Sequence, residues 1–231
     1  MKMTLKFQAA AGAFALLLAA SPVHAQVTAY TSSAAFAAAA PGAPLTEDYS
    51  SGYDSQPIAN GGTFNGIAYN FSAGTNTYGG ALQGGFISGS FGGFNGFVLA
   101  ADQGNNAPEQ FYTNDQITLT FPSWVLAAGV FIEASANTGV YTLALGANTY
   151  TLDSGSVAPD YTDPDSLATY FFLGVVSNNQ FNSITVGGQD SNSGPFVLAG
   201  VQTVPEPATM GVLASGVIGL GASLRRRRRN R

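Results

Sequence analysis

The long middle of the chain can do chemistry only through oxygen atoms and aromatic rings. From Gln26 to Val204 there is no Lys, Arg, His or Cys. The same span holds twelve acids: Glu47, Asp48, Asp54, Asp102, Glu109, Asp115, Glu133, Asp153, Asp160, Asp163, Asp165 and Asp190. The formal charge of this body is therefore −12, whereas the whole chain carries −5. Carboxylates, amides and hydroxyls suit hard cations, and aromatic rings beside them suit neutral sugars.

This composition excludes several classes of activity. A body without cationic side chains cannot neutralise phosphates, so it lacks the main source of affinity for nucleic acids. It also has no arginine clamp, no P-loop lysine and no lysine for a Schiff base. Without Cys or His, a thiolate nucleophile, the usual zinc sites and a Ser-His-Asp triad are all impossible.

One loop concentrates oxygen ligands at a spacing that could hold calcium. Asp160, Asp163 and Asp165 lie close together in the sequence, with Thr162 and Ser166 between or beside them. Carboxylate oxygens at short intervals are typical calcium ligands, although the pattern is not that of an EF-hand. A second loop offers the oxygens of Asp102, Asn105, Asn106 and Glu109. For both loops a solvated turn is the alternative, since Asp and Asn also favour turns.

Several aromatic residues fall in or next to expected loops, where an exposed ring could stack on a sugar. They are Tyr53, Tyr78, Tyr112, Trp124 and Tyr161. For each ring, packing inside the fold is the alternative, and we expect the single tryptophan to close the sandwich described below. A glycosidase would need two carboxylates about 5 to 10 Å apart, one with a raised pKa. Twelve acids supply some pair by chance, so they do not identify an enzyme.

The elements that position these side chains are predicted to be β-strands. Short runs rich in β-branched and aromatic residues are separated by Gly, Asn, Asp and Pro, which is typical of strands and turns. The expected strands cover residues 67–72, 97–101, 117–121, 125–134, 140–145, 149–152, 169–177, 183–186 and 196–203. Alternating apolar residues on either side of residues 146–148 predict a hairpin, and residues 170–176 are apolar on both faces, as expected of a central strand.

One short helix precedes the strands. Ser32 and Ser33 lead into an alanine-rich stretch that ends at Pro41 and Gly42, so capping and breaking residues bracket it.

Residues 61–104 hold 13 glycines. We interpret them as tight turns with phenylalanines in the core, the alternative being a Gly/Phe assembly segment. The predicted fold is an all-β, antiparallel β-sandwich with this N-terminal helix, plus a C-terminal hydrophobic helix.

Residues 1–25 have the pattern of a secretory signal peptide. Lys2 and Lys6 precede an apolar run from Ala9 to Ala20, which is shorter than the roughly 20 residues that span a bilayer. Small residues stand at the positions three and one before Gln26. We therefore expect cleavage before Gln26, which removes the only histidine, His24.

The C-terminal segment combines three features in a fixed order. The motif Val204, Pro205, Glu206 and Pro207 precedes an uncharged run at residues 208–224, and a basic cluster follows at once. The run is long enough for a short membrane-spanning helix, and the cluster would remain on the cytoplasmic side as a membrane stop. The cluster consists of Arg225, Arg226, Arg227, Arg228 and Arg229.

This order of motif, apolar run and arginines resembles the PEP-CTERM sorting signal of Gram-negative bacteria. The resemblance implies recognition by an exosortase, a membrane protease-transpeptidase, and removal of the tail near the motif. It implies an inner-membrane intermediate followed by delivery to the cell surface or the extracellular matrix. The body also resembles the jelly-roll domains of such secreted proteins, through residues 171–177, 181–186 and 196–201. The expected organisation is a signal peptide at 1–25, a sandwich at 26–204 and a sorting signal at 205–231.

The sequence favours an exported, non-catalytic structural or adhesive protein. A carbohydrate-binding module that contacts extracellular polysaccharide and a polysaccharide-acting enzyme are the two alternatives. Calcium is the only cofactor that the residues suggest, and nucleic acid is not an expected partner.

We predict that the two ends are removed during export. Protein recovered from the surface of the native host should begin at or near Gln26 and lack the arginine cluster, as intact-mass analysis would show. Glu206→Ala should impair sorting and leave the body folded, because Glu206 belongs to the sorting motif and not to the sandwich. Surface-delivered protein that still carries Arg225 would contradict this processing.

Overall fold

The described residues form an antiparallel β-sandwich with one short helix, as the sequence pattern predicts. A computed structural model describes residues 26–73, 82–89, 96–104, 107–112, 114–134, 139–164, 167–189 and 195–205. The elements are β1 (Val27–Tyr30), α1 (Ser33–Ala39), β2 (Leu45–Glu47), β3 (Gln56–Ala59), β4 (Thr63–Phe64), β5 (Ile67–Ser72), β6 (Gly84–Ser88), β7 (Val98–Asp102), β8 (Pro108–Glu109), β9 (Gln116–Ala134), β10 (Val140–Leu145), β11 (Asn148–Asp153), β12 (Tyr161–Thr162), β13 (Thr169–Gly188) and β14 (Phe196–Pro205). The predicted C-terminal helix lies outside the described residues.

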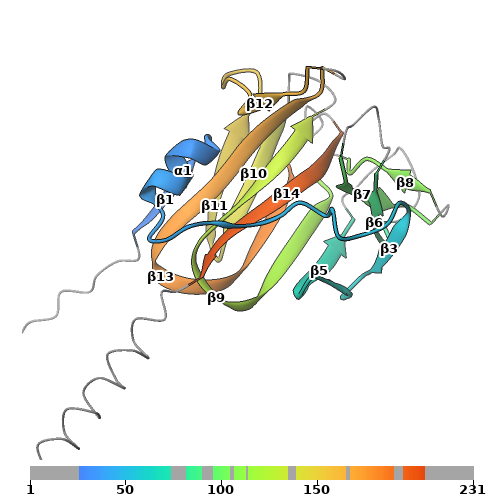
Figure 1. Cartoon of the computed structure of the whole chain (residues 1–231), viewed down its shortest axis with the longest axis horizontal. Helices are drawn as coiled ribbons and strands as arrows, with labels where there is room; N and C mark the ends of the chain where they lie inside the picture. The colour runs from blue at the N-terminus through green and yellow to red at the C-terminus, as the bar shows by residue number, and fades with distance from the viewer. Residues whose placement is uncertain are drawn as a thin grey trace, which may run out of the picture.

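The described strands form one continuous sheet that folds over on itself. Its main path runs β11-β10-β13-β9-β14-β7-β6-β3, and every pairing is antiparallel. The short strands β1 and β12 add to β13, β2 adds to β14, and β5 adds to β9. Figure 1 shows the long strands β9, β13 and β14 side by side in the middle of the molecule.

The two longest strands, β9 and β13, each serve both layers. The first half of β9 pairs with β5 and the second half of β13, whereas its second half pairs with the first half of β13 and with β14. The register between β9 and β13 shifts around residues 121–124 and 177–182. The sequence pattern predicts separate strands at 117–121 and 125–134, and at 169–177 and 183–186. The structure shows that each strand bends there and continues.

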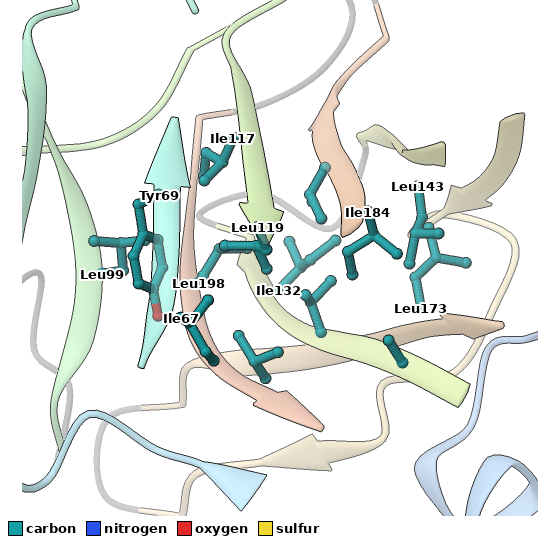
Figure 2. Close-up of a cluster of buried hydrophobic side chains, with 14 of the residues drawn as sticks. Ile67, Tyr69, Leu99, Ile117, Leu119, Ile132, Leu143, Leu173, Ile184 and Leu198 are labelled. Carbon is teal, nitrogen blue, oxygen red and sulfur yellow. The ribbon is translucent and has the colours of Figure 1, made fainter. Parts of the chain in front are cut away.

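The core lies between the two layers. Inward-facing side chains come from both halves of β9, including Ile117 and Leu119 in the first half and Ile132 in the second. Figure 2 shows these side chains meeting those of Ile184, Leu198 and other buried residues. Buried Phe64 and Phe71 belong to the same cluster. For the described part of the glycine-rich segment, this confirms phenylalanines in the core.

The helix α1 covers the outer face of β13. Ser32 caps it as predicted, with its hydroxyl accepting from the Ala35 N–H at 3.5 Å. Phe36 is fully buried, and its ring centroid lies 5.1 Å from that of Phe172. A β-carbon added at Gly174 would stand 2.9 Å from the Phe36 ring. The absence of a side chain at Gly174 therefore lets the helix approach the sheet, and β13 is covered on both faces, as expected for a central strand.

We predict that Phe36 is a main contributor to this docking. Phe36→Ala should lower the free energy of unfolding by about 3 to 5 kcal/mol, because it removes a fully buried ring and leaves a cavity. Denaturant unfolding of the mature protein would measure the loss. As a matched control, Ala38→Ser on the exposed face of α1 should change stability by only about 0.5 kcal/mol. Equal effects of the two substitutions would show that α1 is not docked through Phe36.

Candidate functional site

The candidate site is a cleft on the outer face of the sheet. Its volume is about 460 Å³, within the usual range for small-ligand sites. It is built from elements far apart in sequence: β7, β9, β13 and β14, with β12 and the turn after β2 at its edge. The lining residues are Asp48, Ser50, Gly96, Phe97, Val98, Phe131, Tyr161, Asp163, Tyr170 and Ala199.

The floor of the cleft is apolar. Val98 and Ala199 belong to a small cluster with Ala100 and Val197 on the face opposite the main core. Phe131 adds an aromatic surface and is held at the edge of the Phe172 ring, with centroids 5.1 Å apart. Paired strands supply this floor, and the register between β14 and β9 shifts between Leu198 and Gly200, beside Ala199.

Two tyrosines stand together at one side. Tyr161 and Tyr170 are paired residues of β12 and β13, and their ring centroids lie 5.7 Å apart. Tyr161 is 53% exposed although it is a large ring. An exposed ring supported by a second ring is a suitable platform for the apolar face of a sugar.

Two acids line the cleft with the rings. Asp48 accepts hydrogen bonds from the Ser50 hydroxyl at 2.6 Å and from the Ser50 N–H at 3.0 Å. These bonds hold the pKa of the Asp48 carboxyl below its usual value, so it is ionised at neutral pH. Asp163 is buried in a tight turn in which its N–H donates to the Ala168 carbonyl and its carbonyl accepts from the Leu167 N–H.

A third acid, Glu133, lies beside this floor inside the sheet. It pairs with Tyr170 on β13 and with Val197 on β14, and directly paired residues place their side chains on the same face. Glu133 is only 5% exposed, and among the described residues nothing hydrogen-bonds its Oε2 atom. Burial raises the pKa of Glu133 to about 7. It can therefore hold or release a proton near neutral pH.

The predicted calcium ligands are divided between two places. Asp160 is used by α1: its Oδ1 accepts from the Ser33 N–H at 2.9 Å, and its Oδ2 accepts from the Ser33 hydroxyl. Asp163 lines the cleft, and Asp165 lies outside the described residues. Within the described ranges no three acids are grouped as metal ligands. Calcium binding at this loop stays a prediction.

The second predicted loop is described only in part. The Oδ1 atom of Asp102 accepts from the Gly104 N–H at 2.8 Å, which closes a turn. Glu109 belongs to β8, which pairs with β7. Asn105 and Asn106 lie outside the described residues.

Of the predicted aromatic residues that the structure describes, only Tyr161 lines the cleft. Tyr53 is 64% exposed elsewhere, and Tyr78 lies outside the described residues. The expectation that Trp124 closes the sandwich is wrong. Trp124 is 55% exposed because it lies at the bend of β9, where the strand leaves one layer and enters the other.

Sequence reasoning missed most of the cleft. The signal that could have identified Glu133 is its position within the apolar run of residues 125–134, because a lone carboxylate in a buried strand is unusual. Asp48 and Ser50 gave no such signal, since they reach the site through the pairing of β2 with β14, which are far apart in the sequence.

The sorting motif begins inside the sandwich. Val204 and Pro205 are the last residues of β14 and pair with Ala127 and Val125 of β9. Glu206, Pro207 and Arg225 to Arg229 lie outside the described residues, as does the predicted membrane run. In the described ranges the only helix is α1, and no helix is long and apolar enough to cross a membrane.

Comparison with protein families identifies this C-terminal region. The family model of the PEP-CTERM protein-sorting motif matches residues 203–228. The chain carries a PEP-CTERM sorting signal. A PEP-CTERM protein is an exosortase substrate, so this chain is exported and processed at the membrane. No curated protein matches the sequence.

Solved structures resemble the body of this PEP-CTERM protein only weakly. One is the catalytic domain of a GH87 alpha-1,3-glucanase variant in complex with tetrasaccharides, at 11% identity and a TM-score of 0.35, covering 63% of this chain and 27% of that one. Another is a two-domain esterase active on acetylated mannans, co-crystallised with mannopentaose, at 15% identity and a TM-score of 0.27, covering 65% of this chain and 37% of that one. The chain thus spans less than two fifths of these structures.

We predict that Glu133 lowers stability as pH rises. Its pKa is about 7 in the fold and near 4.5 in the unfolded chain, so between these values the folded state holds a proton that the unfolded state has released. The free energy of unfolding should therefore fall between pH 4.5 and 7 and level off above. Glu133→Gln should remove this fall and stabilise the protein at pH 8 by on the order of 2 to 3 kcal/mol.

Denaturant unfolding at a series of pH values tests this expectation. The exposed Asp153, whose pKa is lowered by bonds from Ser156 and Gly155, supplies the control. Asp153→Asn should keep the fall between pH 4.5 and 7. A Glu133→Gln profile parallel to that of the unmodified protein would contradict the raised pKa.

Proposed function

We propose that the exported body is a non-catalytic adhesive module of the cell surface or extracellular matrix, and that its cleft binds a neutral extracellular polysaccharide. The observation that supports this most is the arrangement of exposed Tyr161 over Tyr170 beside Asp48, Ser50 and Asp163. It joins a flat ring with hydrogen-bond acceptors in a single cleft.

The chemistry of the cleft favours sugars over other ligands. A pyranose has an apolar face of C–H groups, which packs on an aromatic ring, and hydroxyls at its edge, which donate to carboxylates. Phe97 and Phe131 extend the apolar surface beyond the tyrosines. The cleft therefore offers a ring for the apolar face of a sugar and acceptors for its hydroxyls.

The charge of the body favours a neutral polymer. Twelve acids without a compensating base give the body a net negative potential, and Asp48 and Asp163 place part of this charge at the cleft. Uronic acids, sulfated sugars and nucleic acids would be repelled by it. A neutral glycan is the matrix polymer that can approach the cleft without this cost.

A polysaccharide-acting enzyme is the second candidate, and Glu133 is the observation that favours it. A carboxyl with a pKa of about 7 is a suitable general acid, and Asp48, held ionised, is a second carboxyl near the same face. However, Glu133 is buried in the sheet and does not line the cleft. This supports a binding role over catalysis.

We predict that Tyr161 contributes directly to glycan binding. Tyr161→Ala should weaken binding of a neutral polysaccharide by about 1 to 2 kcal/mol, roughly tenfold, because the stacking surface is lost. A glycan array with neutral and acidic polysaccharides would identify the ligand, and calorimetry would measure the change.

Tyr53→Ala is the matched control, since Tyr53 is similarly exposed but does not line the cleft. It should leave binding unchanged. Absence of binding to every neutral glycan would refute the proposal. Release of new reducing ends that stops in Glu133→Gln would instead establish the enzyme.

A further inference from the structure

One end of the sandwich is formed where β9 and β13 bend together. We call this end the corner and define it as residues 122–124 of β9, residues 178–180 of β13, and Gln26 and Pro205. All six bend residues are exposed. In Figure 1, β9 and β13 curve at the same end of the molecule.

Both ends of the described body meet at the corner. The Gln26 carbonyl accepts from the Asn178 N–H at 3.2 Å, and β1 then pairs with β13 from Val27 opposite Ser177. At the other end of the chain, Pro205 pairs with Val125 of β9. The junction with the signal peptide and the junction with the sorting signal therefore lie on the same side of the sandwich.

The tether between the corner and the predicted membrane run is very short. Pro205 is still paired in β14, and only Glu206 and Pro207 separate it from residue 208, where the uncharged run begins. Three Cα steps reach at most about 10 Å when fully extended. A run inserted in the bilayer would therefore hold the corner at the lipid headgroups.

The corner is the part of the body that can approach an anionic surface. No acid occurs in residues 26–46, 116–132, 167–189 or 195–205, which include the segments of β1, β9, β13 and β14 that meet there. The turn between β4 and β5 also approaches the corner, since a β-carbon on Gly66 would lie 3.6 Å from Pro122. The acid beside this turn is Glu47, whose Oε2 accepts a hydrogen bond from Asn65 at 2.7 Å. Along β9, the nearest acids are far from the bend. Asp115 comes just before the strand begins, and Glu133 lies near its end. After cleavage before Gln26, the new α-amino group adds a positive charge at the corner.

The corner also exposes apolar side chains. Trp124 is 55% exposed at the bend of β9. Next to the corner, Leu45 is 61% exposed and pairs with Thr203, two residues before Pro205. Tryptophan is enriched at membrane interfaces, where its ring lies among the headgroups and its N–H stays hydrated.

We propose that the corner rests on the lipid headgroup layer while the sorting signal is attached, with Trp124 inserted in the interface. This proposal rests on membrane insertion of residues 208–224 during sorting. It places the cleft, which lies toward the opposite end of β13 at Tyr170, away from the membrane. The body would thus be presented to the membrane enzyme in one orientation, with the motif at the bilayer surface.

The single tryptophan makes a direct test possible. The chain from Gln26 to Arg231 is reconstituted in vesicles that contain anionic lipids, and Trp124 fluorescence is recorded with lipids brominated at different depths. We expect a shift of the emission to shorter wavelength and the strongest loss of fluorescence with bromine close to the headgroups. Ser123→Asp should reduce this loss because it adds a negative charge at the corner, whereas Thr162→Asp, on β12 beside the cleft, should not.

A matched control moves the single tryptophan from the corner to the cleft. In the double variant Trp124→Tyr with Tyr161→Trp, the tryptophan lies at the cleft and should be neither shifted nor quenched. Flotation of the vesicles separates the two possible failures. Chain that floats with an unquenched Trp124 overturns the docking of the corner alone, whereas chain that does not float overturns membrane insertion and this inference together. Equal quenching from both probe positions also overturns it, because the body would then have no fixed orientation.

Discussion

The pairing of β9 with β13 is the interaction on which the rest of the structure depends. Each strand contributes to both layers, so one antiparallel ladder holds the two halves of the sandwich together. The body has no cationic side chain, and no ion pair between its side chains can replace this ladder. Cohesion therefore comes from backbone hydrogen bonds and apolar burial. The acids remain at the surface, in turns or, for Glu133, within the sheet, where burial raises the pKa.

The same two strands organise the candidate site and the junctions with the two export signals. Away from the bend, their outer faces carry Phe131, Glu133 and Tyr170, which form or adjoin the cleft. At the bend they receive Gln26 and Pro205. The proposed ligand contact and the proposed membrane contact thus fall at different places along the length of one strand pair.

Much of the fold could be predicted from local patterns, because strands β5 and β10 and the cap of α1 depend on residues close together in the chain. The continuity of β9 across Pro122 could not, since it depends on partners in β13, which lies several strands further along the chain. The cleft was hidden for the same reason: Asp48, Tyr161 and Tyr170 meet only through long-range pairing. The sorting signal was fully readable because its information lies in consecutive residues, and the family comparison confirmed it.

The position of Pro205 at the end of β14 has a mechanical consequence. A surface protein that is held by its C-terminus and pulled through a bound polymer transmits the load along β14. That strand is paired with β9 from Phe196 to Pro205, so the load acts parallel to the strands and stretches many hydrogen bonds at once. Such a shear geometry resists rupture far better than peeling from one end. The strand that carries the sorting motif is therefore also the strand that would bear the tension of adhesion.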